Sequence, residues 1–297
     1  MKNVLVLGVS GMLGSMVFDY LSKNSDLNVY GTVRNPKYKV DKVFLFDATD
    51  ISQLETPQFL DLKIDYIINC IGITKPFSKD DDPAGVKRAI AINAKFPWEL
   101  ADHIKKYNIK VLQIATDCVY SGKKGSYLED DSHDPLDVYG KSKSLGEVFD
   151  GSALLIRCSI IGPEPKEQKS FLYEWFLGQK TGDTIGGYEH HKWNGVTTLQ
   201  FAQLCEKIIL LDKFDELIQE SPIQHFIQNS TVNKFELMHI FNDLFNKNLQ
   251  INKVNIPDQS VDRSLGTKHH SLENLVEKTD MKTAILLLKE YKLSNSL

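Results

Sequence analysis

The chain has 297 residues, of which 42% are hydrophobic and 25% are charged, and its formal net charge is −4. This composition is typical of a globular protein of one large domain or two, and the absence of a long basic run disfavours nucleic acid and an anionic membrane surface as partners. The sequence shows neither a signal-like start nor a run of ~18 apolar residues, so we expect a cytoplasmic protein.

The N-terminal residues predict a strand, a glycine turn and a helix. Residues 4–7 are apolar, and the turn after them leads into residues 12–21, whose apolar side chains have helical spacing. Such a turn lets the backbone approach a pyrophosphate at the helix N-terminus, and the alternative is a glycine-rich connection without a ligand. The predicted cofactor-binding residues of the turn are Gly8, Ser10, Gly11, Met12, Leu13 and Gly14.

Short β-branched runs alternate with helical stretches through the first half of the chain. This alternation predicts an α/β fold, a Rossmann-type doubly wound parallel sheet that binds ligands beyond the carboxyl ends of its strands. We expect an NAD(P)-binding domain at residues 1–163 and a smaller mixed α/β substrate-binding region at 164–297, some of whose segments could return to the first domain. The expected strands of the first domain are residues 4–7, 29–33, 43–46, 66–69, 111–115 and 154–157. The elements expected in the second region are helices at 170–177, 198–211 and 234–245 and a short strand at 225–227.

Several residues that follow the second and third expected strands are candidates for binding the adenosine of a cofactor. Arg34 stands where dinucleotide folds meet the adenosine ribose, and an arginine there accommodates the 2′-phosphate of NADP. The alternative for Arg34 is a surface charge in its loop. Asp47 and Ala48 could reach the adenine, whereas an N-cap at Asp50 or a simple turn explains the same segment.

The fourth expected strand and the helix after it supply further candidates. Asn69, Cys70, Ile71 and Gly72 end this strand, where small residues allow the backbone to approach a cofactor, and the alternative is a plain exit from the strand. Asn93 is an amide within an apolar helix. It either bonds to backbone nearby or organises a water molecule.

Thr116, Tyr139 and Lys143 are the candidate proton-transfer residues. Tyr139 and Lys143 are spaced i and i+4, so on a helix they share one face. A nearby ammonium would favour the phenolate and bring the pKa of the phenol closer to working pH. Because this spacing is frequent by chance on solvated helices, the pair gains its significance from Thr116 and the glycine turn.

Taken in order from residue 1 to 162, these residues resemble the extended short-chain dehydrogenase/reductases. Residues 115–122, 127–130 and 139–147, together with Pro135, further resemble the dTDP-4-dehydrorhamnose reductase branch, whose members reduce the 4-keto group of a nucleotide-activated 6-deoxysugar. The resemblance implies that Tyr139 donates the proton, that Thr116 hydrogen-bonds the substrate carbonyl oxygen, and that Lys143 binds the nicotinamide ribose and lowers the pKa of the tyrosine. Tyr139 and Lys143 therefore count as cofactor contacts as well.

The resemblance continues, more weakly, downstream. Residues 193–198 and 262–265 resemble segments of that family that touch the sugar nucleotide. The family usually has tyrosine at Cys118, and an aromatic side chain is common at the position of Ser159, so the identity of the sugar stays open. The predicted substrate contacts are Asp117, Cys118, Trp193 and Arg263, and Ser159 is a predicted cofactor contact.

The expected function is the reduction of a nucleotide-sugar 4-ketone with NADPH, or alternatively NADH, for cell-surface polysaccharide precursors. The alternatives are an epimerase or dehydratase of the same superfamily and a non-catalytic NADP-binding regulatory subunit. The expected partner is a nucleotide sugar. The sequence leaves open whether the protein forms a homodimer. We predict no metal site, because His190 and His191 are adjacent and lack a third ligand, and we expect the four widely spaced cysteines to be reduced.

Overall fold

A seven-stranded parallel sheet forms the centre of the structure, a computed structural model that describes residues 1–167 and 169–294. The strand order is β11-β6-β5-β4-β1-β2-β3. Strands β2 and β3 therefore lie on one side of β1 and all later strands of the sheet on the other, as in doubly wound dinucleotide-binding folds. The predicted α/β fold is confirmed. The strands are β1 (Lys2–Leu7), β2 (Leu27–Val33), β3 (Val43–Leu45), β4 (Tyr66–Asn69), β5 (Lys110–Ala115), β6 (Ala153–Arg157) and β11 (Ile223–His225).

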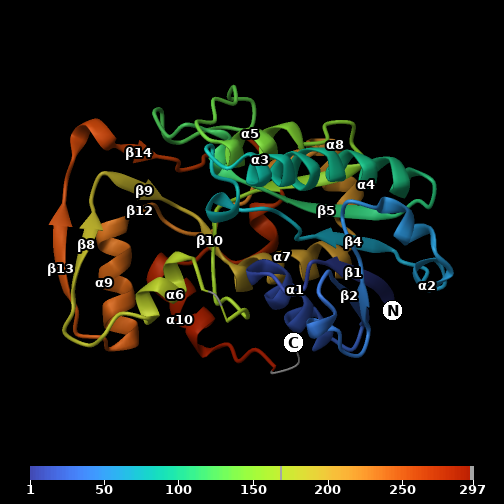
Figure 1. Cartoon of the computed structure of the whole chain (residues 1–297), viewed down its shortest axis with the longest axis horizontal. Helices are drawn as coiled ribbons and strands as arrows, with labels where there is room; N and C mark the ends of the chain where they lie inside the picture. Colours follow the sequence, from blue (N-terminus) through green and yellow to red (C-terminus); the bar gives the residue numbers. More distant parts are fainter. Residues whose placement is uncertain (168, 295–297) are drawn as a thin grey trace.

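The central strands are buried on both faces, which explains their nearly continuous apolar sequences. In β1, Val4 and Val6 belong to one hydrophobic cluster, whereas Leu5 and Leu7 belong to the other. Figure 1 shows α3, α4 and α5 in the layer above the sheet and α1 and α7 in the layer below it. The helices of the two layers are α1 (Met12–Ser22), α3 (Pro83–Ala89), α4 (Phe96–Lys105), α5 (Val138–Leu145) and α7 (Thr198–Leu210). The short helices α2 (Pro57–Leu60) and α8 (Phe214–Glu220) connect strands of the same sheet.

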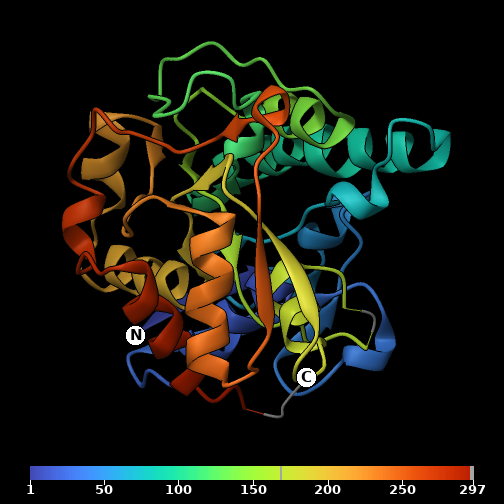
Figure 2. The ribbon, with the colours of Figure 1, turned by 90° about the vertical axis from the view of Figure 1, so that its left-hand side faces the viewer.

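Small sheets and three further helices form the region beyond β6. Pairs are formed by β7 (Ile160–Ile161) with β10 (Val196–Thr197) and by β8 (Thr184–Tyr188) with β13 (Gln250–Val254). A three-stranded sheet has the order β12 (Val232–Asn233), β9 (His191–Trp193) and β14 (Val261–Asp262). The helices are α6 (Leu172–Leu177), α9 (Lys234–Phe245) and α10 (Met281–Glu290), and Figure 2 shows α9 beside the β8–β13 pair.

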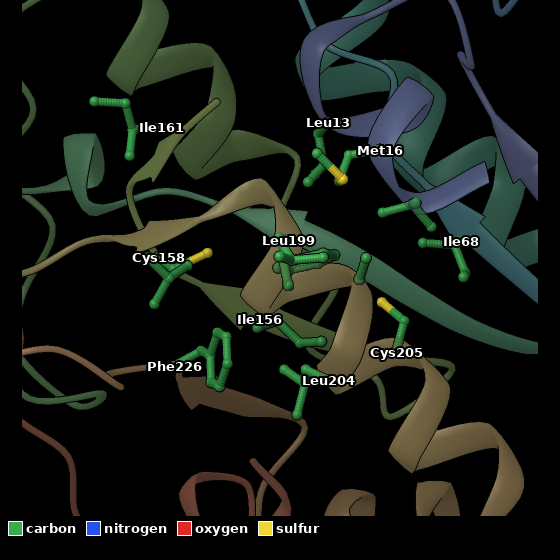
Figure 3. Close-up of a cluster of buried hydrophobic side chains, with 14 of the residues drawn as sticks. Leu13, Met16, Ile68, Ile156, Cys158, Ile161, Leu199, Leu204, Cys205 and Phe226 are labelled. Atoms are coloured by element: carbon green, nitrogen blue, oxygen red, sulfur yellow. The ribbon is translucent and has the colours of Figure 1, made fainter. Parts of the chain in front are cut away.

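Two segments of the second half complete the layers of the first. The strand expected at residues 225–227 is present two residues earlier, as β11, and it pairs in parallel with β6. It is a segment of the second region that returns to the first, which the sequence analysis left open. Its polar side chains are wholly buried, which hid its start from a search for apolar runs. Helix α7 packs on α1 beneath the sheet. In Figure 3, Leu13 and Met16 of α1 share one cluster with Leu199 and Leu204 of α7.

The domain boundary expected at residue 163 stays a prediction, because one hydrophobic cluster contains residues from both sides of it. Within residues 1–167 and 169–294, no helix combines the length and the apolar character that crossing a membrane requires.

Candidate active site

The predicted glycine turn connects β1 to α1 in a conformation that depends on its glycines. Gly8 has a φ of +84°, in the left-handed region that favours glycine. A Cβ on Gly14 would lie 2.3 Å from the carbonyl oxygen of Gly8, so α1 packs directly on the turn. The N-cap residue Gly11 carries no capping side chain, and the first turn of α1 has no acidic residue. The N–H groups and the positive end of α1 therefore remain available to a phosphate.

The strand ends beside the turn hold the predicted adenosine contacts. Arg34 directly follows β2 and is exposed. The Asp47 carboxylate accepts hydrogen bonds from Thr49 N at 3.0 Å and from Thr49 Oγ1 at 2.8 Å. The next residue, Ala48, is buried. Asp50 caps a short 3-10 helix by accepting from Ser52 N at 3.2 Å, as the alternative interpretation of this segment held.

Asn69 fixes the end of β4. Its Nδ2 donates to Gln113 Oε1 on β5 at 3.1 Å, and its Oδ1 accepts from Ile71 N at the same distance. Burial raises the pKa of the Cys70 thiol, so this group stays protonated, and Gly72 follows in the loop. The backbone that leaves β4 is thereby held at the carboxyl edge of the sheet.

Asn93 joins this loop to helix α5. It lies in a π-helical turn (Ile90–Lys95), an irregularity that is frequent at functional sites. Its Oδ1 accepts from Ile73 N at 2.8 Å, and its Nδ2 donates to Ile73 O at 2.8 Å and to Ser142 Oγ at 3.0 Å. Both hydrogens of the Asn93 amide are donated, and its partners Ile73 and Ser142 are distant in sequence. The side chain therefore connects the loop after β4 to helix α5.

Thr116 and Tyr139 approach each other because α5 packs closely on the loop after β5. A Cβ on Gly140 would lie only 2.2 Å from the Cys118 carbonyl oxygen. Asp137 caps α5 by accepting from Gly140 N at 2.8 Å. Burial raises the pKa of Tyr139 well above its ordinary value, and a hydrogen bond with Thr116 partly opposes this rise.

Lys143 lies one turn after Tyr139 and is buried. Its Nζ donates to Ile114 O at 2.9 Å. Burial lowers the pKa of Lys143 to about 8, and the charge of Glu147 is the main influence that opposes this decrease. The expectation that Lys143 lowers the pKa of Tyr139 does not match this arrangement. The pKa of the phenol is raised instead, because burial dominates and the ammonium is directed at a backbone carbonyl.

The four predicted substrate contacts surround the same edge of the sheet. Asp117 and Cys118 follow β5, and burial raises the pKa of the Cys118 thiol to about 12, although the charges of Lys75 and Arg263 oppose the rise. Arg263 follows β14 and donates from its Nε to Tyr120 O at 2.9 Å. Trp193 ends β9 and is buried. Ser159, the remaining predicted cofactor contact, follows β6 and is partly buried.

Three charged residues at this edge were missed by the sequence analysis. Lys75 and Asp137 form an ion pair of 2.8 Å beside Tyr139. Lys234, the first residue of α9, holds its Nζ 4.7 Å from the centroid of the Trp193 ring. No local pattern marks these residues, because each partner comes from a distant segment. A cavity of about 380 Å³ opens beside the first two and is lined by Lys75, Ser78, Lys79, Asp80, Asp81, Asp137 and Tyr139.

The adjacent histidines lie at the start of β9, where burial, as the largest cause, and the charges of Lys234 and Arg263 lower the pKa of His191. His190 Nδ1 lies 3.2 Å from Val254 O, and its ring contacts that of His191 with centroids 4.5 Å apart. In the part of the chain that the structure describes, no three histidine, cysteine or carboxylate side chains are placed to hold a metal ion.

Solved structures with this fold include reductases of nucleotide sugars. A hypothetical dTDP-4-dehydrorhamnose reductase from Sulfolobus tokodaii has a TM-score of 0.72 at 24% identity, with 94% of this chain and 96% of that chain covered. A dTDP-4-dehydrorhamnose reductase from Bacillus anthracis in complex with NADP has a TM-score of 0.74 at 17% identity, with 98% and 100% covered. At these identities the likeness shows the fold.

Sequence relatives extend the comparison. Methionine adenosyltransferase 2 subunit beta of Bos taurus is 23% identical over 251 residues, which cover 82% of this chain and 72% of the relative. The dTDP-4-dehydrorhamnose reductase of Aggregatibacter actinomycetemcomitans is 30% identical over 148 residues, which cover 50% of this chain and 46% of the relative. The model of the RmlD substrate binding domain family matches residues 1–164, more than half of the chain. The chain therefore belongs to the RmlD substrate binding domain family.

Proposed function

We propose that this protein uses NADPH to reduce the 4-keto group of a nucleotide-activated 6-deoxysugar. The observation that carries the proposal is the meeting of Thr116, Tyr139 and Lys143 at the carboxyl edge of the sheet onto which the glycine turn opens. Two relatives in this family carry the name dTDP-4-dehydrorhamnose reductase, which supports this substrate class. A role in polysaccharide precursor synthesis belongs to the same proposal.

The residues around the turn fit a dinucleotide. The uncapped N-terminus of α1 suits its pyrophosphate, and the exposed Arg34 suits the 2′-phosphate of NADPH. The NADP bound by the Bacillus anthracis reductase supports this choice, whereas a dehydratase of the same fold from that organism is in complex with NAD, so NADH is the alternative. When bound, the cofactor supplies the hydride that adds to the ketone carbon.

The chain's own residues handle the proton and the oxygen. Burial keeps the Tyr139 phenol protonated near neutral pH, so it can donate its proton to the oxygen that gains charge as the hydride arrives. The Thr116 hydroxyl donates to Asp117 Oδ1 at 3.2 Å and would turn to hydrogen-bond the ketone oxygen. Lys143, charged below a pKa of about 8, lies one helical turn after Tyr139 and is held by its hydrogen bond to Ile114 O.

The test is an assay of reduced-cofactor loss with a panel of dTDP-, UDP- and GDP-linked 4-keto-6-deoxysugars. We expect stoichiometric oxidation of NADPH with at least one ketosugar, faster than with NADH, and one new hydroxyl in the product. Conversion of the sugar without net oxidation would show an epimerase or dehydratase instead. No reaction across the panel would overturn the proposal.

A second candidate is a non-catalytic NADP-binding subunit of a larger assembly. It is favoured by the match to subunit beta of methionine adenosyltransferase 2, which covers 82% of this chain. For this candidate we expect NADPH binding, no turnover of any ketosugar and a stable complex with a catalytic partner. A homodimer and a cytoplasmic location stay predictions.

A further inference from the structure

A second cavity lies in the layer above the sheet, apart from the candidate active site. It has a volume of about 160 Å³, and Leu5 of β1 and Ile67 of β4, which are opposite each other in the register of the two strands, form part of its lining. Ile64 and Ile109, in the segments that lead into the amino ends of β4 and β5, line it as well. The cavity therefore lies toward the amino edge of the sheet, whereas the candidate active site lies at the carboxyl edge.

The walls of this cavity are mostly apolar and partly aromatic. Phe59 of α2 belongs to the same hydrophobic cluster as Leu5 and Ile67. The rings of His103, in α4, and of Tyr107, just after it, contribute a further wall, with centroids 4.9 Å apart. An apolar cavity of ~150 Å³ is large enough to bind benzene. The size and the lining of this cavity thus fit a single aromatic ring.

His103 brings a buried polar group to the cavity. Its side chain is 5% exposed, and its Nδ1 is fully buried without a hydrogen bond. Glu55 Oε1 lies 3.4 Å from this nitrogen, longer than an ordinary hydrogen bond, and accepts instead from Lys106 Nζ at 2.9 Å.

The imidazole of His103 is neutral in the folded protein. Burial is the largest cause that lowers its pKa, and the charge of Glu55 opposes this decrease. A neutral imidazole carries one N–H donor and one acceptor nitrogen. Leaving such a group buried without a partner costs ~1–3 kcal/mol, so a ligand that forms a hydrogen bond with the ring gains affinity.

We propose that this cavity binds a small single-ring phenol, with its ring against the apolar walls and its hydroxyl hydrogen-bonded to His103. The inference goes beyond the proposed function and does not depend on it. A phenolic hydroxyl both donates and accepts, so it matches either neutral tautomer of the imidazole. It also brings no charge into an apolar cavity, where an unpaired charge would be costly.

The test is a calorimetric titration with phenol and with toluene, which has a methyl group in place of the hydroxyl. We expect phenol to bind about two- to tenfold more tightly than toluene, since a neutral hydrogen bond contributes ~0.5–1.5 kcal/mol. His103→Phe keeps a ring beside Tyr107 and removes both nitrogens, so this preference should disappear. His270→Phe is the matched control at a histidine that is 70% exposed outside the cavity, and it should keep the preference.

A second variant checks where the ligand binds. Ile64→Phe places a larger side chain at a partly exposed lining position, so it should abolish the binding of both probes while the circular dichroism spectrum and the unfolding midpoint stay those of wild type.

The inference is overturned if wild-type protein does not bind phenol, or binds phenol no more tightly than toluene. Phenol binding that persists in Ile64→Phe would place the ligand elsewhere and overturn it too. Benzoate is a third probe, because the exposed side chain of Lys63 also lines the cavity. Binding of benzoate without binding of phenol would make the ligand an acid and contradict the proposal.

Discussion

The phenol of Tyr139 is the group on which the proposed reduction depends most directly. Changing Tyr139 to Phe removes the proton donor and leaves the packing of α5 intact, so we expect kcat to fall by about 10²–10⁴ and the affinity for NADPH to stay unchanged. Tyr107→Phe, at an exposed tyrosine after α4, is the control. The measurements are steady-state kinetics and cofactor titration, and a Tyr139→Phe variant with near-normal kcat would contradict the assignment.

The pKa of Lys143 predicts a pH dependence for the proposed reduction. Burial lowers its pKa to about 8, so its ammonium is present below that pH and lost above it. If the charge assists catalysis, kcat falls as the pH rises through about 8. In Lys143→Arg, which stays charged, any residual kcat should show no such fall. The kcat profile at saturating substrate separates this effect from changes in substrate binding, because burial also lowers the pKa of Lys234 to about 8.

The same lowered pKa affects stability. An unfolded lysine titrates near ~10.4, so between about pH 8 and that value the unfolded chain binds more protons than the folded one. The contribution of Lys143 to the free energy of unfolding therefore rises with pH across this window. Urea titrations of wild type and Lys143→Met at the two ends of the window check this, and a difference between the two proteins that is independent of pH would contradict it.

At the scale of elements, the predicted strands and helices agree well with the structure wherever a local pattern specified them. Strand β4 and helix α9 have the expected bounds. The first is an apolar run buried on both faces, and the second begins at a capping box and keeps helical apolar spacing. Apolar runs and capping boxes involve residues only a few positions apart, so they can be recognised from the sequence alone.

Features that depend on distant partners escaped the prediction. Strand β11 forms only because β6 offers it an edge, and the ion pair of Lys75 with Asp137 joins two loops. The position of Lys234 depends on the pairing of β12 with β9. The glycine turn, Thr116, Tyr139 and Lys143 could be predicted as site residues because each has a recognisable local context, whereas Lys75, Asp137 and Lys234 have none.

A buried ion pair joins β6 to the loops that follow α5 and β5. Arg157 of β6 donates to Glu147 with Nε–Oε1 at 2.9 Å and Nη2–Oε2 at 2.7 Å, and its Nη1 donates to Tyr120 OH at 2.8 Å. Both partners are at most 2% exposed. Arg157→Met leaves the Glu147 carboxylate buried without its partner, so we expect a loss of ~3–5 kcal/mol in the free energy of unfolding.

Chemical denaturation measures this loss. The control is Lys95→Met, which breaks the exposed pair of Lys95 with Glu99 and should hardly move the unfolding midpoint. An Arg157→Met variant as stable as wild type would show that the pair does not hold the elements together.

At the scale of the whole molecule, the core below the sheet is shared between the two halves of the chain. Leu199 and Leu204 of α7 and Phe226 after β11 pack in the same cluster as α1. We therefore expect a fragment of residues 1–164 to unfold without a cooperative transition, although the family model covers all of it. Calorimetry on the fragment and on the full chain tests this, and a sharp transition in the fragment would contradict it.

The parallel sheet receives its last strand late during synthesis. The edge of β6 stays open until β11, some 66 residues further along the chain, has left the ribosome. Until then the nascent chain presents an unpaired strand edge and an apolar sheet face that α7 has not yet covered, the features that favour aggregation. Folding of the N-terminal half is thus tied to translation of the C-terminal half, and a chain stalled before residue 225 would be a substrate for chaperones.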